Sequence, residues 1–278
     1  MERIAVTTAG GRALDAVVNG PKGGDLVLDH HGTPGSCRPL GLQIQAAAER
    51  GLRLARGRDV ASASADAEAI LDAVGAESCF VTGASGGGPH ALACAALLGY
   101  RVRAVATIAG VAPHDAKDLD WTAGMGAENV EELAAARDGE DVLGTWLATE
   151  GAAFAQVTGP QLSDALGDLV DDVDRRALTP EVADEVAAEI REGLAPGLDG
   201  WLDDDLAFVR SWGFDLGAIR VPVTVWQGGQ DRMVPQSHGR WLAANVSGAT
   251  ARFDDAHGHI SLLTEGYGEV LDDLLGRG

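Results

Sequence analysis

Short apolar runs alternate with helical stretches along most of the chain. Strand-like segments occur at residues 3–8, 13–19, 25–30, 52–55, 79–82, 102–109, 221–226 and 249–253. From the third segment onward, stretches with helical spacing of apolar residues separate them, at residues 40–50, 60–74, 87–98, 237–245 and 260–275. This alternation predicts an α/β fold with an eight-stranded, mostly parallel sheet covered by helices on both faces. Only a turn at Gly10 and Gly11 separates the first two segments, so an antiparallel hairpin is predicted at one sheet edge.

The alternation stops between residues 113 and 220, where helical patterns occur without a convincing strand. One apolar stripe there consists of Leu162, Leu166, Leu169 with Val170, and Val173, and a second consists of Val182, Val186 and Ile190. Thr179 and Pro180 introduce the second stripe as N-cap and first helical residue. An all-helical insertion after the sixth strand predicts a lid over the carboxyl edge of the sheet. The core is assigned to residues 1–112 and 221–278, and the lid to residues 113–220.

Composition narrows the class of protein. With 278 residues, 46% of them hydrophobic, the chain can build one large α/β domain that carries an inserted subdomain. No apolar run approaches the roughly 20 residues that a membrane helix needs. The first residues are charged and then strand-like, unlike a signal peptide. We therefore expect a cytoplasmic protein without membrane contact, present as a monomer or homodimer.

Charge and cysteine content exclude further classes. The formal net charge of −21 argues against nucleic acid as a partner, because that needs a basic face, and favours neutral or cationic small-molecule substrates. Acidic runs such as residues 171–172 and 203–205 are interpreted as solvated helix faces, and a coding bias or adaptation to salt would explain the acidity. Cys37, Cys79 and Cys94 form an odd set without metal-ligand spacing, so neither a metal nor another cofactor is predicted.

One glycine-rich segment carries a candidate nucleophile. Residues 83–87 read Gly-Ala-Ser-Gly-Gly, a Gly-x-Ser-x-Gly match between a short apolar strand and an Ala-rich helix. The pattern is weak by itself, but this strand-turn-helix setting is the one that a nucleophile elbow requires. Ser85 is expected to adopt a strained backbone conformation at the turn, while Gly83 and Gly87 let the strand and the helix approach each other.

With these residues the chain resembles the α/β-hydrolase family in its serine-nucleophile branch, which includes esterases, proline iminopeptidases and haloperoxidase-like enzymes. The resemblance covers essentially the whole chain. It implies that nucleophile, acid and histidine follow one another along the chain, each at the carboxyl end of a strand. It also implies catalysis without a cofactor.

Two later segments resemble the family's acid and base. Residues 221–235 contain a strand followed by Gly-x-x-Asp-x-x-Val-Pro, which implies Asp231 as the acid. Asp115, after the sixth strand, is the alternative, because some relatives place their acid there. Residues 257–260 read His-Gly-His-Ile, and the family's Gly-His pattern selects His259 as the base. His257 is then a pocket-lining or exposed loop residue.

The resemblance also indicates the remainder of the site. Residues 31–35, His-Gly-Thr-Pro-Gly, resemble the family's oxyanion loop, which implies that the amides of Thr33 and Gly86 bind the oxyanion. The candidate pocket residues are His31, His90, Trp121, Met125 and Trp146, with Phe154 and Trp201 as further aromatic residues of the lid. If the substrate carried an ammonium group, the lid acids Glu128, Glu131 and Glu150 would be available to hold it.

The chain departs from the family after the fourth strand. Relatives carry a longer loop resembling Asp-x-Arg-Gly-x-Gly-x-Ser, whereas residues 52–58 lead into the next helix within a few positions. Either this loop is shortened, which would open one wall of the site, or the sequence lacks residues there. An intact mass clearly above 28.6 kDa would show the second case.

These features predict hydrolysis of a small ester, lactone or amide through an acyl-enzyme intermediate. Two alternatives stay open, a proline-iminopeptidase-like aminopeptidase and a non-catalytic ligand-binding member of the same fold. Serine at the elbow argues against dehalogenase or epoxide-hydrolase chemistry, because relatives with those activities carry Asp there.

Overall fold

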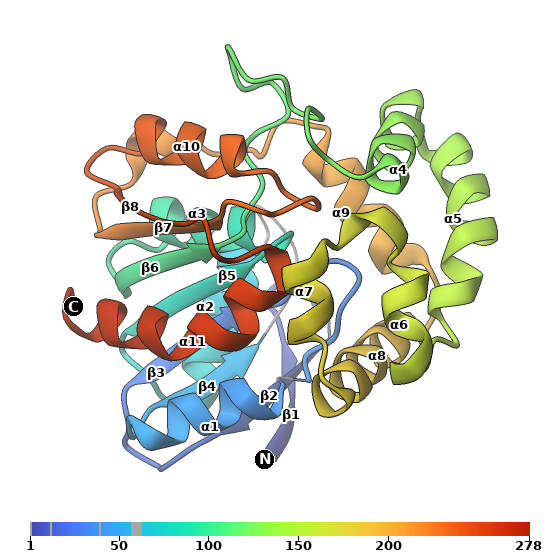
Figure 1. The fold of residues 1–278 in the computed structure, drawn as a ribbon. Coiled ribbons are helices and arrows are strands. Elements are labelled where there is room, and N and C mark those ends of the chain that lie inside the picture. Colours follow the sequence, from blue (N-terminus) through green and yellow to red (C-terminus); the bar gives the residue numbers. More distant parts are fainter. Residues whose placement is uncertain (1, 12, 39, 57–62) are drawn as a thin grey trace.

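The strands of the protein form one sheet in the order β1-β2-β4-β3-β5-β6-β7-β8. The computed structural model describes residues 2–11, 13–38, 40–56 and 63–278 (Figure 1). The strands are β1 (Glu2–Thr7), β2 (Ala13–Asn19), β3 (Leu26–His30), β4 (Arg53–Arg56), β5 (Cys79–Ala84), β6 (Val102–Ile108), β7 (Val223–Gly228) and β8 (Thr250–Asp254). The connection through Gly57 and Arg58, where the sequence predicts a shortened loop, lies outside the described residues.

Two kinds of strand pairing divide the sheet. Five neighbouring pairs, from β4–β3 across to β7–β8, are parallel, whereas β1–β2 and β2–β4 are antiparallel. The predicted N-terminal hairpin is confirmed, and Gly11 (φ 80°) donates its amide to Thr8 O at 2.9 Å in the turn. Because the parallel strands from β4 to β8 follow one another in the sheet, their carboxyl ends meet at one edge, where ligands of open α/β sheets bind.

Alternate residues of the central strands point to two different cores. Leu28, Val81 and Val105 pack in one core with α2 (Ala63–Val74), α3 (Gly87–Leu97) and α10 (Gln236–Asn245). Val27, Phe80 and Ala104 pack in the other, with α1 (Gly41–Glu49) and α11 (His259–Leu275), which Figure 1 shows in front of the sheet. Successive side chains of a strand point to opposite faces, so a nearly continuous apolar run is what a sheet covered on both sides requires.

Residues 109–222, which we call the helical insertion, connect β6 to β7, and all of them are described. The insertion contains no strand, and its helices gather at one side of the sheet (Figure 1). They are α4 (Ala127–Asp138), α5 (Glu140–Phe154), α6 (Gly159–Ala165), η1 (Gly167–Leu169), α7 (Asp172–Ala177), α8 (Pro180–Leu194), α9 (Asp199–Phe208) and η2 (Leu216–Ala218). A separate apolar core, which includes Leu143, Leu147 and Leu162, holds these helices together.

The two apolar stripes of the insertion differ in outcome. The second begins a helix at Pro180, and the Thr179 hydroxyl accepts the Val182 amide at 3.4 Å, as an N-cap should. The first is not a single helix. Gly167, the first residue of η1, adopts a left-handed conformation (φ 50°) after the end of α6, and α7 begins only at Asp172. Leu162, Leu166 and Leu169 nevertheless share the apolar core of the insertion.

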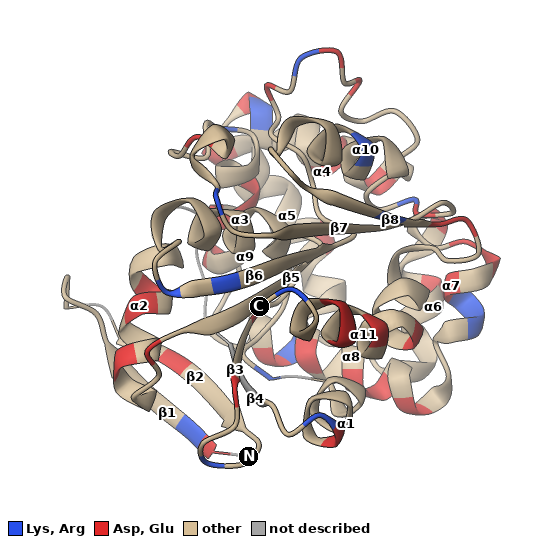
Figure 2. Cartoon of the chain, turned by 90° about the vertical axis from the view of Figure 1, so that its left-hand side faces the viewer, with Lys and Arg blue, Asp and Glu red and all other residues tan. Residues whose placement is uncertain are grey.

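Charged residues cover much of the remaining surface. Figure 2 shows Asp and Glu positions (red) spread over many of the helices, with far fewer Lys and Arg positions (blue) between them. In the part of the chain that the structure describes, no helix is both long and apolar enough to cross a membrane.

His238 in α10 joins the core to the start of the insertion. Its side chain is completely buried, its Nδ1 accepts the Ala112 amide at 3.1 Å, and its Nε2 donates to Trp121 O at 2.8 Å. An imidazole that accepts at one nitrogen and donates at the other is neutral. Burial lowers the pKa of His238 from 6.5 to about 4. No feature of the sequence indicated a structural role for His238.

We predict that His238 makes the protein less stable as the pH falls from about 6.5 to about 4. In that range the unfolded chain binds a proton at His238 and the folded chain does not, so protonation favours unfolding. The loss from this group should reach about 3 kcal/mol near pH 4, where the unfolded chain is fully protonated at His238 and the folded chain only half protonated. Urea denaturation of the wild type and His238→Gln across this range measures it. Equal slopes of unfolding free energy against pH in the two proteins would contradict the assignment.

Candidate active site

The turn between β5 and α3 presents Ser85. Ser85 has φ 52°, a left-handed conformation that non-glycine residues rarely adopt. Its amide donates to Ile108 O on the neighbouring strand at 2.8 Å, and its carbonyl accepts the Gly88 amide at 2.9 Å. Bonds on both sides hold the serine in this strained conformation, and strained residues that the surroundings hold in place are typical of functional sites.

Close contact between strands and helix explains the glycines around Ser85. A Cβ on Gly83 would lie 2.2 Å from Gly87 O, and a Cβ on Gly87 would lie 2.2 Å from His30 O in β3. Real side chains do not approach backbone atoms so closely, so both positions require glycine. The steric role predicted for Gly83 and Gly87 agrees with this geometry.

Asp231 follows β7 and is fixed by four hydrogen bonds. Its Oδ1 accepts the amides of Met233 (2.9 Å) and Val234 (2.7 Å), and its Oδ2 accepts Gln227 Nε2 at 2.9 Å. The same Oδ2 lies 2.9 Å from His259 Nδ1 at the start of α11. The side chain of Asp231 is fully buried and that of His259 is 12% exposed, so the pair is shielded from water.

Burial and charge act in opposite senses on this pair. Burial alone lowers the pKa of His259, but the charge and hydrogen bond of Asp231 and the charge of Asp174 outweigh it, so the pKa is raised from 6.5. Burial raises the pKa of Asp231, and His259 and the Val234 amide oppose that rise. Because Nδ1 is engaged with Asp231, Nε2 is the nitrogen that remains for proton transfer.

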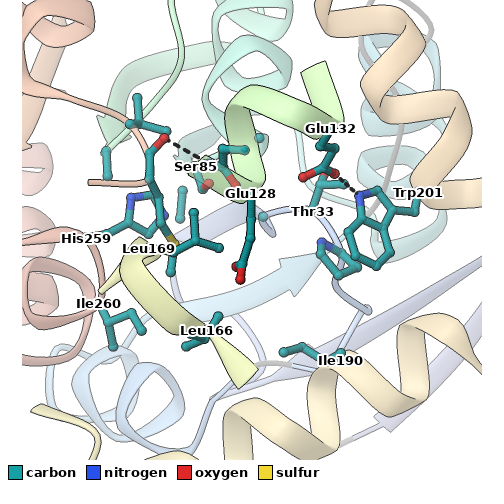
Figure 3. Close-up of a pocket in the computed structure, with 18 of the residues that line it drawn as sticks. Thr33, Ser85, Glu128, Glu132, Leu166, Leu169, Ile190, Trp201, His259 and Ile260 are labelled. Carbon is teal, nitrogen blue, oxygen red and sulfur yellow. Dashed lines mark hydrogen bonds between the residues drawn. The ribbon is translucent and has the colours of Figure 1, made fainter. Parts of the chain in front are cut away.

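Ser85 and His259 line the same cavity, which has a volume of about 330 Å³ (Figure 3). Thr33 and Gly86 line it as well, and a Cβ on Gly86 would lie 2.7 Å from Thr33 Oγ1, so the two turns are in close contact. The Thr33 hydroxyl donates to Asp204 Oδ2 of α9 at 2.7 Å, which ties this loop to the helical insertion. Four of the five residues that the sequence placed at the reaction centre thus line one cavity, and the fifth, Asp231, is bonded to His259.

Comparison with known proteins agrees with the architecture. Residues 26–266 match the family model described as "alpha/beta hydrolase fold". The chain belongs to the α/β-hydrolase fold family. No curated protein matches the sequence.

Solved structures of this α/β-hydrolase family resemble the whole chain. An alpha/beta hydrolase fold protein from Nakamurella multipartita is 25% identical, covers 99% of both chains and has a TM-score of 0.61. A thermophilic esterase from Thermogutta terrifontis is 17% identical over 99% of this chain and 98% of its own, with a TM-score of 0.66. The enol-lactonase from Burkholderia xenovorans is 18% identical over 98% and 100%, with a TM-score of 0.64. At such low identity, the second and third likenesses show the fold alone.

Three of the predicted pocket residues, Trp121, Met125 and Trp146, line the cavity of this α/β-hydrolase, as do Phe154 and Trp201. His31 and His90 do not, and their prediction as pocket residues was wrong. His31 is buried with its Nδ1 2.7 Å from Gly32 O, and it is not among the residues that line the cavity. His90 in α3 is buried behind the elbow, with its ring 5.9 Å from that of His30 and 6.4 Å from that of Phe208.

The alternative acid and base lie away from the cavity. Asp115 is exposed in the loop after β6. His257 is oriented toward surface acids, with Nε2 3.8 Å from Asp254 and Nδ1 3.7 Å from Glu265. Neither lines the cavity that holds Ser85.

Carboxylates form one wall of the cavity. The acidic residues that line it are Glu128, Glu132, Glu150, Glu189 and Asp205, and its described lining contains no Lys or Arg. Glu132 accepts Trp201 Nε1 at 2.5 Å and pairs with Asp205. Burial raises the pKa of Glu132, and its hydrogen bonds with Asp205 and Trp201 oppose that rise.

Sequence reasoning recovered only part of this acidic wall. It named Glu128 and Glu150 correctly, but Glu131 is exposed and does not line the cavity. Glu132 could have been found, because it lies four residues after Glu128 on the same face of α4. Asp204 and Asp205 were interpreted as solvated, and that was wrong, since they are only 5% and 3% exposed. Elsewhere, the described residues hold no group of three or more His, Cys, Asp or Glu that could bind a metal ion.

We predict that Gly83→Ala destabilises the protein by about 1–3 kcal/mol, because the added methyl group would overlap Gly87 O and the Ala91 methyl. Gly144→Ala in α5 is the matched control. Its Cβ would meet only Leu202 Cδ1 at an ordinary 3.5 Å, and alanine favours helix by about 1 kcal/mol. Urea unfolding monitored by circular dichroism distinguishes the two. The elbow geometry would be refuted if Gly83→Ala were as stable as the wild type.

Proposed function

We propose that the protein is a serine hydrolase that cleaves a small ester, lactone or amide through an acyl-enzyme. The observation that carries this proposal is the opening of one cavity onto both the strained Ser85 and the buried His259–Asp231 pair. A cavity of about 330 Å³ lies at the small end of ligand pockets, which span about 300–1,000 Å³, and supports a small substrate.

In the proposed first step, Ser85 Oγ attacks the substrate carbonyl while His259 Nε2 takes its proton. Asp231 holds Nδ1–H and stabilises the imidazolium that forms. The amides of Thr33 and Gly86 bind the oxyanion, where each donor contributes about 3–4 kcal/mol to transition-state stabilisation. His259 then gives its proton to the leaving alcohol or amine. Water next attacks the acyl-enzyme, again with His259 as the base, and the carboxylic acid is released from Ser85.

The helical insertion acts as a lid in this proposal. It supplies Trp121, Met125, Trp146 and the carboxylate wall, while the sheet supplies the reacting groups. A lid that excludes water strengthens the electrostatic interactions within the site. If the protein showed no catalysis, it would instead be a ligand-binding member of the same fold.

We expect Ser85→Ala to lose hydrolysis of p-nitrophenyl acetate and butyrate by on the order of 10³-fold or more in kcat/KM, because no other nucleophile lines the turn. Ser247→Ala, in an exposed turn after α10, is the matched control and should keep wild-type rates. A fluorophosphonate probe should label the wild type and the control, and leave Ser85→Ala unlabelled. Absence of both turnover and labelling in the wild type would refute the proposal that the protein is an enzyme.

The acidic wall favours a second candidate, hydrolysis of aminoacyl amides or esters that carry a free ammonium group. Glu132 and Asp205 are hydrogen-bonded carboxyl groups at the cavity surface, and a substrate ammonium could bind between them. Hydrogen bonds to charged groups contribute roughly 1.5–3 kcal/mol. An anionic substrate would meet five carboxyl groups and no Lys or Arg in the described lining.

For this candidate we predict that Glu132→Gln raises KM for an aminoacyl p-nitroanilide by roughly 10-fold or more and leaves KM of its N-acetylated analogue nearly unchanged, because only the first has a charge to bind. Glu131→Gln, the exposed neighbour, is the control and should alter neither value. Faster cleavage of the acetylated analogue by the wild type, with no effect of Glu132→Gln on either substrate, would favour the simple esterase.

A further inference from the structure

A carboxylate from the helical insertion caps the helix that carries His259. Asp174 in α7 accepts the His259 amide on Oδ2 at 2.8 Å and both the amide and the hydroxyl of Ser261 on Oδ1, each at 2.8 Å. Its side chain is completely buried. The contact is close, because a Cβ on Gly258 would lie 2.5 Å from Asp174 Oδ2.

The start of α11 needs such a partner. The first amides of a helix have no acceptor within the helix, and the N-cap residue usually supplies one from its side chain. Here the N-cap is Gly258, which has no side chain, and Ser261 Oγ accepts the Gly258 amide at 2.8 Å. Asp174 accepts the next donors from outside the helix, and a carboxylate at a helix N-terminus is further stabilised by the helix dipole.

Asp174 is itself held in position by its own helix. Asp171 caps α7 by accepting the amides of Val173 at 2.9 Å and Asp174 at 3.2 Å. Arg175 donates to the carbonyl (3.0 Å) and hydroxyl (2.8 Å) of Ser163 in α6, which fastens α7 to the rest of the insertion. A rigid insertion therefore presents the carboxylate to the first turn of α11.

We propose that Asp174 is a positioning residue for His259, which sets the start of α11 from the insertion and places a negative charge beside the imidazole. The proposal rests on the assignment of His259 as the base. In this proposal the helical insertion covers the site and also orients one of its reacting groups, His259.

The other charged groups around His259 determine how the loss of the Asp174 charge would affect protonation of the imidazole. Asp231 contacts Nδ1 from the β7 loop, Asp174 lies on the side of α7, and Glu128 of α4 lines the same cavity. On the neighbouring elements, Arg232 pairs with Asp168, Arg175 bonds to α6, and His257 faces Asp254 and Glu265. No Lys or Arg of the described cavity lining offsets the acids, so Asp174 favours the imidazolium.

The test compares Asp174→Asn with Asp172→Asn. Asparagine keeps the size of the side chain and one acceptor oxygen but removes the charge, and Asp172 is an exposed carboxylate of the same helix. Histidine titration followed by NMR in labelled protein should show the His259 midpoint moving to lower pH by roughly half a unit to one unit in Asp174→Asn. In Asp172→Asn the midpoint should stay at the wild-type value. With p-nitrophenyl butyrate, the acid limb of kcat/KM should move in the same direction, and kcat should fall roughly tenfold with KM changed less than twofold.

An unchanged His259 midpoint in folded Asp174→Asn would overturn the proposal. The NMR titration needs no substrate, so an inactive wild type would refute the proposed function and leave this test intact. If Asp174→Asn does not fold, Ser261→Ala replaces it, since that change removes one of the three donors to Asp174 and keeps every charge. A smaller loss of kcat with unchanged KM is then expected, and wild-type kcat would again refute the role of Asp174.

Discussion

The close approach of α3 to strands β3 and β5 is the contact on which the site depends. Glycine at 83 and 87 lets the backbones meet where any side chain would overlap, and this forces Ser85 into its left-handed conformation. The same contact brings the loop that follows β3, with Thr33, against Gly86 at the start of α3. The positions of the proposed nucleophile and of the loop proposed to bind the oxyanion therefore follow from one packing constraint. A parallel sheet provides this constraint because its strands end at a common edge.

Buried carboxylates link the helical insertion to that edge. Asp174 caps the helix of His259, Asp204 accepts the Thr33 hydroxyl, and Glu132 with Asp205 forms part of the cavity wall. Most of the described acidic residues of this chain, which has a net charge of −21, are exposed or half-exposed, so water screens them. The few that matter for the site are removed from water, and each keeps a hydrogen-bond partner, as buried charge requires. Removal of the insertion would thus disturb the proposed base and oxyanion loop as well as the pocket.

Local patterns predicted much of the fold and the reacting groups. Alternating strands and helices predicted the sheet because a strand buried on both faces needs a continuous apolar run. Ser85 follows β5 directly in a tight turn, so its surroundings along the chain indicated its place. Asp231 and His259 were indicated by motifs that resemble those of the family. Long-range contacts were beyond this reasoning. His238 bonds Ala112 and Trp121 from more than a hundred residues away, and His90 lies behind the elbow although its sequence neighbours suggested the pocket.

The sequence by itself determined the order of strands and helices, the glycines of the elbow and the three candidate reacting residues, because each depends on neighbours within a few positions. Only the tertiary structure decided which acids are solvated. Asp203 is exposed while the next two residues are buried, and an acidic run carries no signal of that difference. It also decided that Asp174 of α7 bonds to the first turn of α11, 85 residues later. Burial and hydrogen bonding of a charge depend on what packs against it from distant parts of the chain, and that information exists only once the chain has folded.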